Sequence, residues 1–396
     1  MKTLIKDSQG MALLIVTFVV TMLLTMTGAS LFFARLDLKK TSHHRTGSMA
    51  FYVADAGISH AFQELADGDG TNDFATVSST TDPTTLLSNT GFGSGSYTVV
   101  AELVPGSSPK RVKVKSTGCV PAATGAGSCP SGNAQVVLES QFKQFSVPLP
   151  GSITLIGDSA DFTGGQSNAK LLSGDEASGC GLTPSKPVVA VTDGASKASV
   201  QMAINNSKPG TYVTAYAGGK TDDIVASGEV NNIKNTYGFD YTNVNDLKLL
   251  VAIIEKKADY IVQSGGTPPS LGSVGDEKLV VADGDLTLGP GSGAGILVVK
   301  GNLTLHGNVS YRGVILVIGT GVMTRFGGGN GAITGGTLVA KVVGPDGIYG
   351  TADDALGPGP MFDTSGGGNS DYRYCSSAVN DAFSKLILML SWNQAF

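Results

Sequence analysis

The sequence predicts an α+β protein: a long N-terminal helix packed on a small antiparallel sheet, followed by a glycine-rich, β-solenoid-like C-terminal domain with added helices. Three observations predict this class. No charged residue falls between Asp7 and Arg35, short segments farther along alternate apolar and polar residues, and a unit of strand and glycine turn then repeats. The chain holds 55 glycines, about twice the roughly 28 that average usage would give.

The first element is the uncharged stretch from Gly10 to Ala34, which follows a short basic leader. Its apolar part spans about 36 Å as a helix, enough to cross a hydrocarbon core of about 30 Å. A secretory signal peptide is the alternative, but its apolar region is usually about 7–15 residues and ends before polar sequence. Here a helical pattern continues to about Leu65. We therefore expect a leader at 1–10, a helix at 11–66 and a membrane span at 11–34.

The start of the chain also carries a family resemblance. A basic leader that ends in Gly10 and runs into an uncharged helix resembles the class III signal of type IV prepilins, and AFYVADAGISHAFQEL (50–65) resembles the N-terminal domain of PilX-type minor pilins. The resemblance implies that a prepilin peptidase cuts after Gly10 and methylates the new amino terminus on Met11. Most major pilins carry a Glu at the place of Ile15, so its absence argues for a minor subunit.

A stripe of small or hydroxyl-bearing residues runs along one face of the apolar segment: Thr17, Thr21, Thr25 and Gly28. In lipid, small residues allow close approach of helices and threonines hydrogen-bond between them, which predicts a packing face for other pilin helices. In the alternative, each threonine bonds a carbonyl of its own helix.

Farther along, the helix has a face of small residues beside a face of bulky ones. The small residues are Ala50, Ala54, Gly57 and Ala61, and the bulky ones are Phe51, Ile58, Phe62 and Leu65. We expect the bulky face to pack on the first globular domain and the small face to accept a closely packed partner.

Residues 96–104, 110–117 and 134–145 alternate apolar and polar side chains, which predicts strands of an antiparallel sheet. The segment 146–151 contains two prolines and a glycine, which is typical of a linker. The expected division is therefore a small pilin-type β domain at 67–145, the linker, and a β-rich C-terminal domain at 152–396.

In the C-terminal domain, short β-branched strands and glycine turns repeat at intervals of about 17 to 23 residues. This predicts a β-solenoid; a β-sandwich with regular hairpins is the alternative. The residues expected to point inward are Leu286, Leu288, Ile296, Val298, Leu303, Leu305, Val314, Leu316 and Ile318. Helices are expected at 195–206, 244–262 and 377–390.

Four cysteines form an even set in a chain whose bulk is expected outside the cytoplasm, where disulfides persist. The favoured pairing is Cys119 with Cys129, because the loop between them is polar and turn-prone; Cys180 with Cys375 follows by elimination. Four buried thiols are the alternative. The sequence has no CxxC motif and no histidine at zinc-ligand spacing.

Little in the sequence supports catalysis. The net charge is −5 and the basic residues form only short groups, which argues against nucleic-acid binding. No aligned pair of carboxylates is evident, so we expect no enzymatic activity. Asp346, Asp353 and Asp354 share one glycine-rich loop and offer oxygen ligands for Ca²⁺, although an exposed acidic turn needs no metal. No other cofactor is indicated.

The resemblance implies a minor pilin that acts in pilus assembly and in tip display or adhesion. Its implied partners are other pilins, a prepilin peptidase, the bacterial inner membrane before assembly, and a surface or glycan ligand. We expect a single membrane span with the bulk outside the cytoplasm, and later a place on the pilus or cell surface. Two alternatives stay open: a membrane-anchored β-helix protein that binds or cleaves polysaccharide, and a type II secretion pseudopilin.

Overall fold

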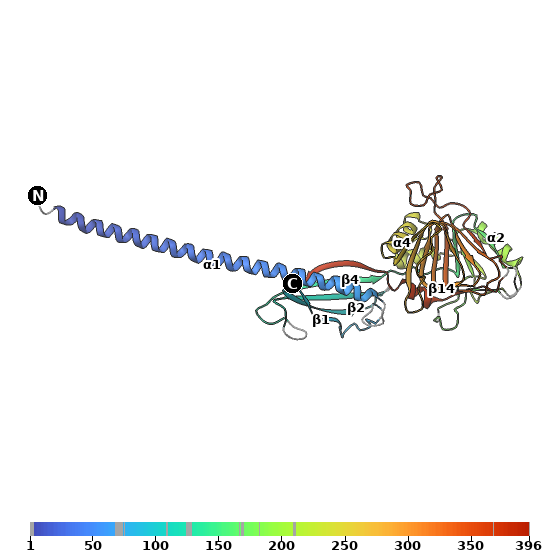
Figure 1. Cartoon of the computed structure of the whole chain (residues 1–396), viewed down its shortest axis with the longest axis horizontal. Coiled ribbons are helices and arrows are strands. Elements are labelled where there is room, and N and C mark those ends of the chain that lie inside the picture. The colour runs from blue at the N-terminus through green and yellow to red at the C-terminus, as the bar shows by residue number, and fades with distance from the viewer. Residues whose placement is uncertain are drawn as a thin grey trace.

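The structure is a computed structural model of the chain that describes residues 4–67, 74, 76–107, 110–123, 129–165, 167, 170–181, 183–208, 211–366 and 368–395. Within these ranges, side chains are described from Leu13 to Gln394. One long helix leads to a small sheet, and a larger body of strands and short helices follows (Figure 1). The predicted α+β class, with one long apolar N-terminal helix and several sheets, is confirmed.

The N-terminal helix α1 (Leu4–Asp67) is continuous through Gly28. Buried side chains of its second half belong to one core with side chains of a five-stranded antiparallel sheet. The strands of this sheet are, in spatial order, β1 (Thr84–Phe92), β2 (Gly95–Leu103), β3 (Arg111–Val120), β4 (Ala134–Gln144) and β21 (Ile387–Ala395). The middle three are the strands that alternation predicted. β1 was not predicted because its exposed and buried residues do not alternate.

The last strand corrects two expectations. The segment 377–390 was predicted as a helix, but helix α5 (Ser376–Phe383) ends early and β21 then pairs antiparallel with β4. Residues 387–395 therefore belong to the first sheet, although the C-terminal domain was predicted to extend over 152–396. Ser140 Oγ donates to the Ser391 carbonyl across the new pair, at 2.7 Å. Phe51 of α1 lies edge-to-face on Trp392, with ring centroids 5.6 Å apart.

Between β4 and β21 the chain forms a body of strands that we name the parallel stack, because its named strands all pair in parallel. Its strands are β5 (Ile153–Ile156), β6 (Asp161–Thr163), β7 (Leu171–Ser173), β8 (Val189–Val191), β9 (Tyr212–Val213), β10 (Thr221–Asp223), β11 (Tyr260–Gln263), β12 (Lys278–Asp283), β13 (Leu286–Leu288), β14 (Gly291–Val299), β15 (Leu303–His306), β16 (Val309–Gly319), β17 (Val322–Phe326), β18 (Ala332–Lys341), β19 (Met361–Asp363) and β20 (Asp371–Tyr374). They form a long sheet, β10-β8-β5-β18-β16-β14-β12-β11, which β20, β7 and β9 extend from β18, and a second sheet, β13-β15-β17-β19-β6.

The long strands β14, β16 and β18 each contain a glycine with positive φ at the same register position: Gly295, Gly313 and Gly335, with φ of +119°, +131° and +139°. A Cβ on Gly313 would lie 2.1 Å from the carbonyl oxygen of Gly295. Only glycine fits both this backbone conformation and this close approach.

The long sheet is buried on both faces, which corrects the predicted set of inward residues. Five of them, Ile296, Val298, Val314, Leu316 and Ile318, belong to a core shared with helices on one face of the sheet. Their neighbours Leu297, Val299, Ile315 and Val317 belong to a separate core shared with the second sheet. Alternation could not separate the two faces, because strands covered on both sides are apolar throughout.

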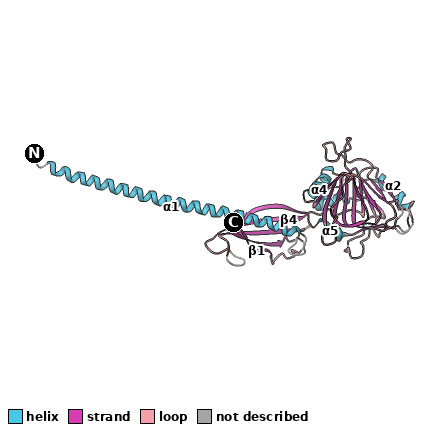
Figure 2. Ribbon diagram, in the orientation of Figure 1, coloured by secondary structure: helices cyan, strands magenta, loops and turns pink. Residues whose placement is uncertain are grey.

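Short helices lie around the parallel stack, with α4 and α5 near the end that faces α1 and α2 near the opposite end (Figure 2). Helix α2 (Gly194–Asn205) matches the first predicted helix, and α4 (Val244–Lys256) matches the start of the second, which ends before β11. Helix α3 (Glu229–Tyr237) was not predicted, since it is short and carries only two buried residues, Val230 and Ile233. Side chains of α3, α4 and α5 share a core with the long sheet.

The chain enters the parallel stack in its middle. After β4 it forms β5 and then adds strands on one side of β5 as far as the edge strand β10. It passes through α3 and α4 to β11, at the opposite edge of the long sheet, and from there adds strands back to β18, beside β5. There β18 pairs with β5, β19 with β6, and β20 with β7. We name these three pairings the seam, because they join the first and last strands of the stack.

Candidate membrane-anchoring and assembly surface

The first half of α1 is an apolar surface with no partner among the described residues. All side chains from 13 to 45 are exposed, and the helix projects away from the rest of the molecule (Figure 1). The large apolar side chains include Leu13, Leu24 and Phe33, with exposed fractions of 67%, 65% and 64%. In the described part of the chain, α1 is the one helix that is long and apolar enough to cross a membrane. Apolar exposure of this extent is unfavourable in water and favourable in lipid or against other helices.

The threonine stripe is bonded within its own helix. Thr17 Oγ1 donates to the carbonyls of Leu13 and Leu14, at 3.0 and 2.9 Å, and Thr21 and Thr25 make the same kind of bond. This is the arrangement that the alternative interpretation predicted. Gly28 has no atom within 4 Å of an added Cβ, so that face is open to a neighbouring helix.

Ile15 is 57% exposed and lies on the apolar surface. Because this side chain is uncharged, it cannot form an ion pair with an amino terminus that lies near it. Gly10 and Met11, the predicted cleavage pair, lie in the helical backbone of α1, but their side chains are outside the described residues.

The small face of the helix is not open to a partner, which corrects that expectation. Ala50, Ala54 and Ala61 are fully buried, and Gly57 is buried with them. A Cβ on Gly57 would lie 2.2 Å from Ser116 Oγ of β3. The small residues therefore allow α1 to approach this chain's own sheet.

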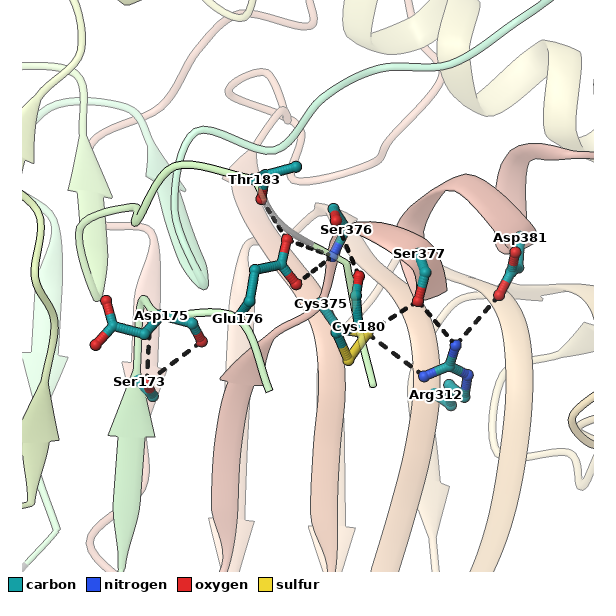
Figure 3. The surroundings of a disulfide bond; sticks show 10 residues. All are labelled: Ser173, Asp175, Glu176, Cys180, Thr183, Arg312, Cys375, Ser376, Ser377 and Asp381. Carbon is teal, nitrogen blue, oxygen red and sulfur yellow. Dashed lines mark hydrogen bonds and ion pairs between the residues drawn. A yellow bond between two sulfur atoms is a disulfide. The ribbon is translucent and has the colours of Figure 1, made fainter. Parts of the chain in front are cut away.

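Both predicted disulfides are present: Cys119–Cys129 and Cys180–Cys375. The first closes the connection between β3 and β4. The second lies just beyond β7 and β20 and ties the two sides of the seam together (Figure 3). Both of its sulfur atoms belong to buried residues.

Polar groups surround the second disulfide (Figure 3). Arg312 of β16 donates from Nη1 to Cys375 Sγ at 3.4 Å, and its Nη2 lies 3.2 Å from Asp381 Oδ2. The Glu176 carboxylate accepts hydrogen bonds from the Ser376 backbone at 3.1 and 3.2 Å. These contacts hold the start of α5 at the end of β20.

Glu176, Cys180 and Cys375 are the one group of three potential metal ligands brought within 4.8 Å among the described residues. Because the two cysteines are joined in a disulfide, their sulfur atoms are not thiolate ligands. The arrangement therefore serves to connect strands of the seam.

The acidic loop does not gather its three aspartates around one point. Asp354 is buried and its Oδ2 lies 2.8 Å from Lys248 Nζ of α4. Asp353 Oδ1 accepts a hydrogen bond from Thr351 Oγ1 at 2.6 Å, and this bond holds the pKa of Asp353 below its usual value. Asp346 Oδ1 accepts from the Ile348 backbone at 2.9 Å. Each carboxylate thus has a partner within the protein, and the loop is anchored to α4.

The sequence did not predict that β21 lies beside the point where α1 leaves the first sheet. Tyr52 and Trp392 of β21 each lie edge-to-face with Phe51, and their exposed fractions are 67% and 41%. This aromatic group lies where α1 emerges from the sheet. The position of Trp392 could not be predicted, because its strand pairs with β4, which precedes it by about 250 residues.

No protein-family model matches the chain, and searches of curated proteins and of solved structures find no significant match. The main functional feature of the chain is therefore its own helix α1, whose exposed apolar half is continuous with a half that shares its core with a sheet.

Proposed function

We propose that this chain is a minor subunit of a type IV pilus, held in the bacterial inner membrane by the apolar half of α1 before it enters a filament. One observation carries the proposal: a single unbroken helix has an exposed apolar first half and a second half that belongs to the core of an antiparallel sheet. Such a helix can pass from lipid to a bundle of similar helices without refolding, because both environments are apolar.

The sequence motifs at each end of the helix support the same role. The basic leader before Met11 resembles a prepilin signal, and the stretch 50–65 resembles PilX-type minor pilins. In this proposal a prepilin peptidase cuts at Gly10–Met11 and methylates Met11, and other pilins pack against the face of Thr17, Thr21 and Gly28.

We propose further that the parallel stack is a β-solenoid displayed at the filament tip. Its strands pair in parallel with closely matched registers, for example Leu303 with Met323 and Met323 with Phe362. A body of this size, inserted between β4 and β21, is difficult to repeat at every step of a thin fibre. At the tip it would contact surfaces, which makes adhesion a second role.

The experiment is intact-mass measurement with N-terminal sequencing of the protein from cells with and without a prepilin peptidase. We expect a mature chain that starts at N-methylated Met11 only when the peptidase is present. A Gly10→Val variant should remain full length in both strains, since the cleavage site is lost. A chain that begins at Met1 in wild-type cells would contradict the proposal and leave α1 as a plain membrane anchor.

A further inference from the structure

Two cations are buried at one corner of the parallel stack. Lys170, just before β7, is 2% exposed, and Arg325 of β17 is 3% exposed. Arg325 pairs in register with Leu305 of the neighbouring strand β15. The position that holds a leucine side chain in β15 therefore holds a guanidinium group in β17. A buried arginine and a buried lysine together are rare without acidic partners.

The hydrogen bonds of Lys170 go to neutral acceptors. Its Nζ donates to the backbone carbonyls of Thr364 and Gly366. These bonds satisfy donors, but the carbonyl oxygens carry no negative charge to balance the ammonium group.

Arg325 is only partly satisfied. Its Nη2 donates to the carbonyls of Gly307, Val309 and Gly331 at 3.3, 3.1 and 3.4 Å. Its Nη1 is buried and makes no hydrogen bond among the described residues. The Tyr372 hydroxyl makes none of good geometry there, although the side chains of Arg325 and Thr364 lie close enough to oppose the rise that burial causes in its pKa. The guanidinium carbon lies 5.9 Å from the centroid of the Tyr372 ring. Unused donors therefore occur close together at this corner.

One nearby acid, Asp363, offsets part of the charge of the pair. Among the described residues, neither Lys170 nor Arg325 forms an ion pair. Asp363 is used by the Ser365 backbone at 2.7 Å, and Asp371 pairs with Arg373 at 2.7 Å. Burial, and then the charge of Arg325, lower the pKa of Lys170, while the charge of Asp363 opposes that shift. One carboxylate for two buried cations leaves one positive charge unbalanced, which is strongly unfavourable.

We propose that this corner binds a small monovalent anion, such as chloride, which accepts from Arg325 Nη1 and the Tyr372 hydroxyl and balances the charge of Lys170. An acceptor with negative charge meets both needs, because the carbonyl oxygens at this corner are already used by Lys170 and by Arg325 Nη2 and carry no charge. The anion would join β17 to β20 and so hold two sides of the stack together. This inference does not depend on the proposed pilus role.

The alternative is that Lys170 is uncharged, in which case one buried cation remains and no anion is needed. The two cases differ in how stability responds to chloride. We would measure the melting temperature of the full chain in detergent micelles while gluconate, which is too large for a buried site, is replaced by chloride at constant ionic strength. Chloride binding predicts a saturable rise of about 3 °C.

Variants test whether the response comes from this corner. Arg325→Gln and Lys170→Met should each abolish the chloride-dependent rise; Lys170→Met keeps the apolar stem and decides the question if Arg325→Gln does not fold. Arg373→Gln is the matched control, because it removes a nearby cation that already has an acid partner, and it should keep the rise. An equal melting temperature in chloride and gluconate, or a response that persists in Lys170→Met, would overturn the proposal.

Discussion

At Gly118, strand β3 passes so close to helix α1 that a side chain has no room. A Cβ there would lie 2.3 Å from the carbonyl oxygen of Ala50 and 2.6 Å from the backbone nitrogen of Ala54. Because these atoms are backbone, helix and strand would have to separate. We expect Gly118→Ala to lower the free energy of unfolding by about 1–3 kcal/mol, measured by urea unfolding of the full chain in detergent.

The control for Gly118 is Gly47→Ala, the same change at a helical glycine with no atom within 4 Å of its added Cβ. Alanine favours the helix, so this variant should gain up to about 1 kcal/mol. If Gly118→Ala were as stable as Gly47→Ala, the close contact between α1 and β3 would be wrong.

Among the elements, the loop between β18 and β19 depends on one buried carboxylate. The Asp354 side chain is 1% exposed and contacts Lys248 of α4, and its Oδ2 also accepts from the Gly350 backbone at 2.8 Å. Asp354→Asn removes the charge from this pair. We expect a loss of about 1–3 kcal/mol locally, toward the lower end because Lys248 is 31% exposed and partly screened. Hydrogen exchange of the loop amides should rise.

Asp346→Asn is the matched change in the same loop. Asp346 is exposed, and among the described residues its Oδ1 accepts from the Ile348 backbone alone, a bond that an asparagine oxygen also makes. Exchange should therefore stay near the wild-type rate. Faster exchange in Asp346→Asn than in Asp354→Asn would show that Lys248 does not anchor the loop.

Elements that face water on one side could be predicted, and elements covered on both sides could not. Strands β2, β3 and β4 alternate because one face is solvated, and the apolar half of α1 is evident from composition alone. In β16 the run VILVI is apolar throughout, so its two faces look alike in sequence. For the candidate site, the sequence of α1 alone could not show that its small face packs inward. That contact depends on Gly118 of β3, which lies far along the chain from the helix.

For the whole molecule, the central fact is that the parallel stack is inserted into the first sheet between β4 and β21. The chain enters and leaves the stack at the seam, so the pairings that close it join residues about 200 apart in sequence. Contacts between such distant segments require a large loss of chain entropy. The disulfide Cys180–Cys375 lies at this point and spans 195 residues, whereas Cys119–Cys129 spans 10.

Loop-closure entropy therefore predicts unequal roles for the two disulfides. Replacing Cys180 and Cys375 by serine should destabilise the stack by about 5 kcal/mol, and replacing Cys119 and Cys129 should destabilise the first sheet by about 3 kcal/mol. The single tryptophan, Trp392, lies in β21, so its fluorescence follows the first sheet, while near-ultraviolet circular dichroism of tyrosine follows mainly the stack, which holds nine of the eleven tyrosines. In urea, the first pair of changes should move the circular dichroism transition more than the fluorescence transition, and the second pair should do the reverse. Coincident shifts of both signals in both variants would mean that stack and sheet unfold as one unit, and an unchanged transition without Cys180–Cys375 would show that the strand pairings alone hold the seam.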